Sequence, residues 1–149
     1  MNKKIIYDLI NNKITNIHCN FQLLFNYYNN NKYDKFLNAL KINKSIKTIN
    51  FEFIQNQYIN EDYKYNNEII DDLLNPILDI LKNKQITRIT LCTNIIYLFD
   101  KIETLLINDI NIKLYVIFFK DKFINESEIN NFKNKYSSRI INYSLWTQN

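Results

Sequence analysis

The chain contains no glycine and only one proline among its 149 residues. Glycine is the residue that lets a backbone loop approach a phosphate closely, as in nucleotide-binding loops and dinucleotide-binding turns. The strained turn that presents a catalytic serine in many hydrolases also has glycine on both sides. The missing glycine therefore argues against phosphate-binding loops of these kinds and against that class of hydrolase.

Cysteine and histidine are also scarce, and Cys19, Cys92 and His18 are the whole set. Two cysteines do not make a disulfide framework, and their separation lacks the close spacing of a zinc site. His18 and Cys19 are neighbours on an expected strand, so their side chains point to opposite faces and do not act together. We therefore expect no catalytic residue, no metal site and no cofactor, and the chain is not predicted to be an enzyme.

Long apolar runs are missing as well, since no stretch reaches the roughly 20 apolar residues of a membrane span. This predicts a cytoplasmic protein, in its own cell or in a host cell, with no membrane partner. The net charge of +4 comes from basic residues scattered among acids, so nucleic acid is not the expected partner. The abundance of Asn, Ile, Lys and Tyr, which share A/T-rich codons, indicates an A+T-rich genome, such as that of a virus or phage, a protist or a low-GC bacterium.

What the chain does contain is a repeated pattern. The length of the chain and its 46% share of hydrophobic residues are typical of one globular domain, 1–149. The pattern apolar-x-x-apolar-x-apolar recurs at Ile14-Ile17-Cys19, Ile46-Ile49-Phe51, Ile86-Ile89-Leu91, Ile112-Tyr115-Ile117 and Ile140-Tyr143-Leu145. Each copy is followed by alternation or by an apolar run, as in strands. We divide the domain into an amino-terminal cap, 1–13, and about five strand–helix repeats, 14–149.

Segments with helical spacing lie between these strands. Their apolar positions fall within 33–40, 69–81, 98–106 and 129–136. Strands that alternate with helices predict parallel pairing through right-handed crossovers, and hence an α/β fold with five parallel strands. Two architectures remain open. One is a short solenoid with helices on one face, and the other is an open or doubly wound sheet with helices on both.

The strand patterns favour the one-sided sheet. A strand with one open face alternates between apolar and polar residues, whereas a strand covered on both faces is apolar throughout. The segments 17–21, 49–53 and 141–145 alternate, and 86–91 alternates in part. The segment 114–119 is the exception, because it is apolar at every position.

The copy Ile86-Thr87-Arg88-Ile89-Thr90-Leu91-Cys92-Thr93-Asn94 matches the L-x-x-L-x-L-x-x-N signature in full. On this motif and the repeated pattern, residues 14–149 resemble the leucine-rich-repeat family, in the variety with a helix in each repeat. The resemblance implies a short solenoid whose sheet provides a binding surface. The chain departs from the family in its irregular spacing and in having Asn at the last signature position only at Asn94.

In this repeat register, a set of side chains is expected on the face of the sheet away from the helices. The predicted binding surface is Arg88, Thr90, Cys92, Leu114, Val116, Phe118, Ser144 and Trp146. Its last two strands would present an apolar patch centred on Phe118 and Trp146. Exposed patches of this kind mark protein interfaces, and a self-complementary one would also give a homodimer.

The main functional hypothesis is therefore a protein–protein interaction module, in keeping with a viral or phage inhibitor or adaptor that acts on a host protein. One alternative is a small α/β enzyme or nuclease-like protein with carboxylates at strand ends, marked by Asp121 and Asn94 converging with another acid. A second alternative is a nucleic-acid-binding protein. Its marker would be one edge lined by Lys44, Lys47, Lys84, Arg88 and Lys113.

Overall fold

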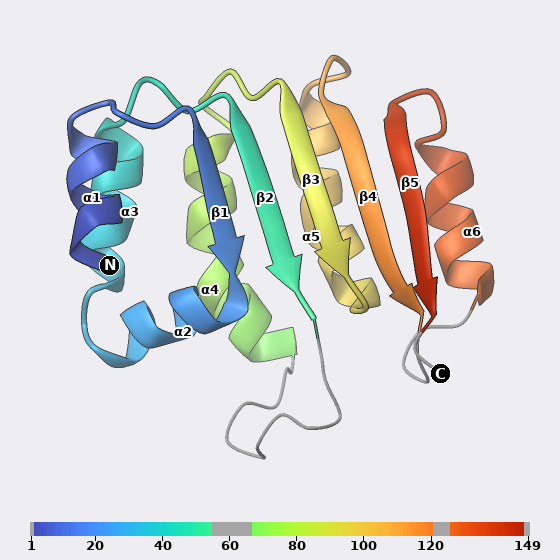
Figure 1. Ribbon diagram of the computed structural model, residues 1–149, viewed down its shortest axis with the longest axis horizontal. Helices are drawn as coiled ribbons and strands as arrows, with labels where there is room; N and C mark the ends of the chain where they lie inside the picture. The colour runs from blue at the N-terminus through green and yellow to red at the C-terminus, as the bar shows by residue number, and fades with distance from the viewer. Residues whose placement is uncertain (1, 55–66, 121–125, 148–149) are drawn as a thin grey trace.

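The computed structural model of the chain describes residues 2–54, 67–120 and 126–147. In chain order the elements are α1 (Asn2–Ile10), β1 (Asn16–Asn20), α2 (Phe21–Asn29), α3 (Tyr33–Ile42), β2 (Thr48–Phe53), α4 (Asn67–Leu81), β3 (Arg88–Thr93), α5 (Ile96–Asn108), β4 (Lys113–Lys120), α6 (Glu126–Lys135) and β5 (Ile140–Thr147) (Figure 1). Among these described helices, none is long and apolar enough to cross a membrane.

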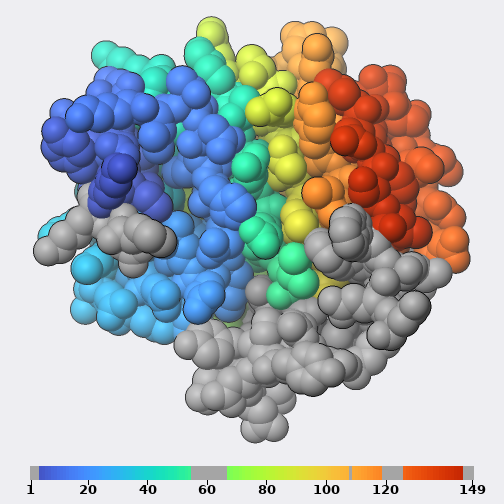
Figure 2. Space-filling view, in the orientation of Figure 1, coloured from blue at the N-terminus to red at the C-terminus, as the bar shows by residue number. Residues whose placement is uncertain are grey.

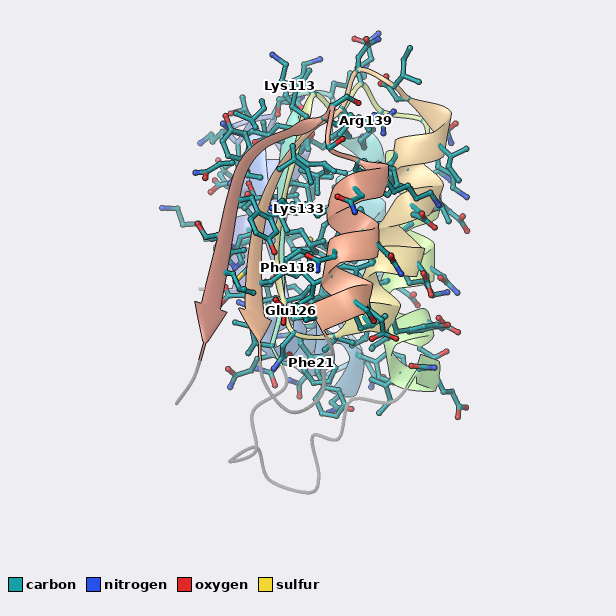
Figure 3. All side chains as sticks on the ribbon, turned by 90° about the vertical axis from the view of Figure 1, so that its right-hand side faces the viewer. Phe21, Lys113, Phe118, Glu126, Lys133 and Arg139 are labelled. Carbon is teal, nitrogen blue, oxygen red and sulfur yellow. The ribbon has the colours of Figure 1, made fainter. Side chains whose placement is uncertain are left out.

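All strands of the sheet are parallel, and their order in space, β1-β2-β3-β4-β5, is their order in the chain. Because every crossover runs in the same direction, right-handed connections place the crossing helices on one side. Figures 1 and 3 show α3, α4, α5 and α6 together on one side of the sheet, with α1 beside α3. The predicted α/β class with five parallel strands is thus confirmed, and the strand order is not that of a doubly wound sheet.

The core lies between the sheet and these helices. Buried strand residues form rows across the sheet, namely Ile17, Ile49, Ile89 and Leu114, then Cys19, Phe51, Leu91 and Val116, then Phe53, Thr93 and Phe118. α4 faces them with Leu73, Leu74 and Ile77, and it runs as one helix through Pro76. Burying each large apolar side chain contributes about 1.5–3 kcal/mol, so these rows fix which face of each strand turns inward.

The residues of β4 that face the core differ from the sequence prediction by a shift of one position. Leu114, Val116 and Phe118 are fully buried in the core, whereas the repeat pattern assigned them to the opposite face. The connection into β4 is shorter than the one into β3, because buried Ile112 lies two positions before Leu114 while Ile86 lies three before Ile89. A one-residue slip of this kind moves every side chain of a strand to the other face.

The chain forms two helices between β1 and β2, where the pattern predicted one. α2 begins at Phe21, directly after β1, and Asn20 caps it by accepting a hydrogen bond from the N–H of Leu23 at 2.7 Å. Asn is a favoured residue at this capping position. Since the last strand residue is also the helix cap, no polar linker in the sequence marks the boundary.

Asparagine occupies positions where glycine is the usual residue. Asn12 and Asn31 have left-handed backbone angles, with φ of 54° and 56°, and Asn enters this region more readily than most residues. Asn43 is buried after α3, where its Oδ1 accepts from the N–H of Ile46 at 2.9 Å and its Nδ2 donates to the carbonyl of Leu9 at 2.9 Å. The second of these bonds ties the amino-terminal cap to the start of the next repeat.

Candidate binding surface on the open face of the sheet

On the side of the sheet opposite the helices, side chains from β1 to β5 reach the surface in Figure 2. Alternate residues of each strand point to this side. From β1 toward β5 they form three rows, namely Asn16, Thr48, Arg88 and Lys113, then His18, Asn50, Thr90, Tyr115 and Asn142, then Asn20, Glu52, Cys92, Ile117 and Ser144. We call these residues the open face.

The β1–β2 half of the open face is polar. His18 Nε2 and Glu52 Oε2 lie 2.8 Å apart, with side chains that are 46% and 43% exposed. Beside them, Thr48 Oγ1 donates to Asn16 Oδ1 at 2.7 Å. Surface pairs of this kind contribute about 0–1 kcal/mol to stability. These groups therefore present hydrogen-bonding capacity to solvent more than they hold the fold together.

The β3–β4 half is mixed in character. The Arg88 guanidinium lies over the ring of Tyr115, 5.2 Å from its centroid. Tyr115 and Ile117 are both half-buried, and Ile117 pairs in register with Cys92. Tyr and Arg are the side chains that most often dominate binding energy at protein interfaces, because each combines a large apolar surface with a polar group.

The structure brings together about half of the predicted binding surface. Arg88, Thr90, Cys92 and Ser144 lie on the open face as expected. Leu114, Val116 and Phe118 do not, because they are buried against the helices. The apolar patch predicted on β4 is therefore wrong.

The sequence interpretation missed Tyr115 and Ile117, which take the places assigned to the buried β4 residues. The short spacing between Ile112 and Leu114 is the signal that distinguishes the two registers. Trp146 pairs by backbone register with Phe119, and the side chain of Trp146 lies outside the part of the chain that the structure describes.

The thiols are poor nucleophiles. Burial, and then the nearby carboxylate of Glu52, raises the pKa of Cys92 to about 11. Burial alone raises the pKa of Cys19 to about 12. The ring of His18 is hydrogen-bonded to Glu52 rather than to sulfur. A catalytic cysteine needs a lowered pKa and a neighbouring base, so the described thiols do not have the environment of an activated nucleophile.

The structure describes only one of the two residues that mark the enzyme alternative. Asn94 is buried just after β3, at 2% exposure, and Asp121 lies outside the described residues. In residues 2–54, 67–120 and 126–147, no three His, Cys, Asp or Glu side chains gather as metal ligands.

A groove of about 430 Å³ lies on the helix side, between α3 and α4, where Lys41 and Lys84 contribute to its lining.

Basic residues gather at the amino ends of the strands. Lys47 precedes β2, Arg88 begins β3 and Lys113 begins β4, and all three are exposed. Arg139 precedes β5, and Figure 3 shows it at the same end of the sheet as Lys113. Lys84 is held differently, because its ammonium donates to the carbonyl of Asn43. Of the five residues predicted to line a nucleic-acid-binding edge, Lys47, Arg88 and Lys113 thus lie at the amino end of the sheet.

Comparisons with protein-family models, with curated proteins and with solved structures find no match to this chain.

Proposed function

We propose that the chain is a protein-interaction module that binds its partner on the open face. The observation that carries the proposal is a sheet with α3, α4, α5 and α6 on one side, and with Arg88, Tyr115 and Ile117 adjacent on the other. Protein interfaces combine a core of aromatic and Arg side chains with a polar rim. On the open face the polar rim is supplied by His18 and Glu52.

The order of the strands supports the resemblance to helix-containing leucine-rich repeats, and we take the fold to be a short solenoid of that kind. In such arrays each repeat contacts its neighbours, and the exposed sheet serves as an extended binding surface. The A+T-rich composition further supports a viral or phage origin, in which the module inhibits or adapts a host protein.

Two features favour binding over catalysis. In α/β enzymes the ligand crevice forms where the strand order reverses, and the described strands keep their chain order throughout. The pKa of Cys92, the thiol on the open face, is raised rather than lowered. Both features suit a surface that recognises a partner by shape and hydrogen bonding.

A photo-crosslinking experiment tests the proposal. A benzophenone amino acid replaces Tyr115 on the open face or, as a matched control, the exposed Thr104 on α5. In cells that make the chain, we expect a discrete adduct from position 115 that Ile117→Asp removes, and none from position 104. No adduct at 115, or the same adduct from both positions, would contradict the proposal.

The basic residues at the amino end of the sheet favour a second candidate, single-stranded nucleic acid. Arg88 lies over the half-buried ring of Tyr115, and Lys47 and Lys113 lie at the same end of neighbouring strands. Cationic rows follow a phosphate backbone while aromatic rings stack on bases. Titration of a fluorescent oligonucleotide at rising salt is the test. Binding that weakens steeply with salt and is lost in a Lys47→Glu, Lys113→Glu variant would favour this candidate, and no binding at low salt would remove it.

A further inference from the structure

The connections that lead from a helix into each strand lie together at the amino end of the sheet (Figure 1). They are 11–15, 43–47, 82–87, 109–112 and 136–139. These five connections hold one acid, Asp109, and six basic residues, which are Lys13, Lys44, Lys47, Lys82, Lys84 and Arg139. The positive charge of this end alone thus exceeds the net charge of +4 of the whole chain.

Several of these cations have no acid to neutralise them. Lys44, Lys47 and Lys113, the first residue of β4, are exposed, and no carboxylate of the described residues forms an ion pair with them. Lys82 does form one, with Asp79 at 3.6 Å. Figure 3 shows Lys113 at the tip of this end. The amino end therefore presents a positive potential that attracts anionic partners.

Exposed isoleucines lie at the same end. Ile107, in the last turn of α5, is 70% exposed, and Ile110, in the connection that follows, is 78% exposed. They are the most exposed large apolar side chains of the described residues. Ile42 and Ile10, the last residues of α3 and α1, are exposed as well. Apolar side chains grouped in water are typical of a surface that meets a partner.

Two simpler explanations account for the cations alone. Helix dipoles favour cations near the carboxyl ends of helices, and phosphate backbones of nucleic acids favour rows of cations. Neither gives a reason for isoleucines at the same place. A lipid bilayer with anionic headgroups matches both features, because lysines contact the headgroups while apolar side chains enter the boundary of the hydrocarbon.

We propose that the amino end of the sheet binds the surface of an anionic lipid bilayer. Ile107 and Ile110 insert among the headgroups, and Lys44, Lys47 and Lys113 contact the phosphate and carboxylate groups around them. Such binding needs no spanning segment, so the sequence expectation of no membrane partner, which came from the missing apolar run, does not address it. Only Lys113 is shared with the open face, and the proposal does not rest on the proposed function.

Co-sedimentation of the purified full chain with vesicles tests the proposal. We expect binding to vesicles of phosphatidylserine and phosphatidylcholine in equal parts, and none to pure phosphatidylcholine. Ile107→Ser with Ile110→Ser leaves the charge unchanged and should weaken binding at least about tenfold. Lys44→Gln with Lys47→Gln should weaken it about fivefold for each lysine removed.

Matched controls make the same chemical changes away from the amino end. Lys4→Gln with Lys35→Gln removes two exposed lysines from the first turns of α1 and α3, and Leu145→Ser removes an exposed apolar side chain from β5. These variants should bind as the wild type does. No binding of the wild type, or equal losses in the controls, would overturn the proposal. Binding that the lysine variant loses and the isoleucine variant keeps would indicate a surface for polyanions in general, and would overturn it too.

A fluorescence measurement tests insertion directly. An environment-sensitive dye is attached to Ile110→Cys or, as a control, to Lys35→Cys, each in a Cys92→Ser background where the remaining Cys19 is buried. Phosphatidylserine vesicles should shift the emission of the dye at position 110 to shorter wavelength and leave that at position 35 unchanged. No shift at 110, or the same shift at both positions, would contradict insertion through the amino end.

Discussion

The two edge strands of the sheet differ in how their core-side residues are covered. In β1, Ile17 and Cys19 are 3% and 1% exposed, because helices close that end of the core. In β5, the core-side Leu145 is 41% exposed, and Ile141, the extra residue of a bulge, is 52% exposed. A strand–helix repeat cannot bury its apolar face alone. The difference teaches that the described helices close the β1 end of the core, whereas apolar side chains at the β5 end stay in contact with solvent.

The β1 end is closed by α1, which packs against α3 and contributes the fully buried Leu9. Hydrogen bonds fix this helix in place. Asn43 donates to the carbonyl of Leu9, and the N–H of Lys44 donates to Asn12 Oδ1 at 2.8 Å. At the β5 end, the corresponding connection is held by Arg139, which donates to the carbonyl of Asp109 at 2.8 Å.

The largest expected effect compares one leucine from each end. Leu9→Ala should lower the free energy of unfolding by about 2–5 kcal/mol, because it opens a cavity in the closed end of the core. Leu145→Ala should cost about 1 kcal/mol or less, since much of that side chain is already in water. Urea unfolding of the two variants and of the wild type measures both losses. Equal losses would contradict the difference between the ends.

The hydrogen bonds at the two ends should differ next. Asn43→Ala leaves buried backbone groups at Leu9 and Ile46 without their partner, at roughly 1–3 kcal/mol for each group. Arg139→Met removes a partly exposed side chain and should cost about 1 kcal/mol. Thermal unfolding followed by circular dichroism compares the two variants. A larger loss for Arg139→Met would show that the β5 end is the more tightly held one.

Alkaline pH should weaken the closed end. Burial raises the pKa of Cys19 to about 12 and, with the Cys19 charge as the smaller cause, that of Tyr27 to about 12. Groups with a raised pKa stabilise the folded state fully below their unfolded pKa, and this contribution is lost as pH rises toward the folded value. For the thiol the loss is about 1.4 kcal/mol per pH unit above its ordinary pKa of about 9.

Unfolding measured between pH 7 and 11 checks this expectation. The slope above pH 9 should be shallower in Cys19→Ala than in the wild type, because the variant has no thiol to titrate at that site. Cys92→Ala, at a half-buried position, should change the slope less. Identical slopes in all three proteins would refute the role of Cys19.

The smallest effect is expected at the ion pair nearest the β5 end, where Lys135 binds Glu103. The pKa of Glu103 is lowered by its hydrogen bonds to Lys135 and Tyr136. Lys135 is 60% exposed, so Lys135→Met should lower stability by less than about 1 kcal/mol. Because the Glu103 pKa is depressed, this contribution is present at neutral pH and lost on acidification. A loss of several kcal/mol in urea unfolding would mean that this ion pair, and not apolar packing, stabilises the β5 end of the fold.

Periodicity predicted much of the fold correctly. The registers of β1, β2 and β3 follow from residues such as Ile17, Ile49 and Ile89, because apolar and polar residues alternate there. The register of β4 did not follow, since residues 114–119 are apolar at every position and fit either face. The helix at Phe21 was missed because Asn20 is both the last residue of β1 and the N-cap of α2, so no linker separates the two elements.

The residues of the candidate site could be predicted only on the strands whose register was predicted correctly. Arg88, Thr90 and Cys92 were placed on the open face because the β3 register was right. Tyr115 and Ile117 were assigned to the core because the β4 register was wrong. The exposure of Leu145 at the β5 edge could not be predicted. The alternation of apolar residues shows which face of a strand turns toward the helices, but not whether a helix covers that position.

Thiol labelling along β4 tests the central claim, a sheet open on one face with Ile117 outside and Val116 inside. Ile117→Cys and Val116→Cys are each made in a Cys92→Ser background, where the remaining Cys19 is buried. We predict that a maleimide dye labels position 117 rapidly in the native state, and position 116 only as fast as the protein unfolds. Rapid labelling at 116 with protection at 117 would contradict the register and the open face built on it.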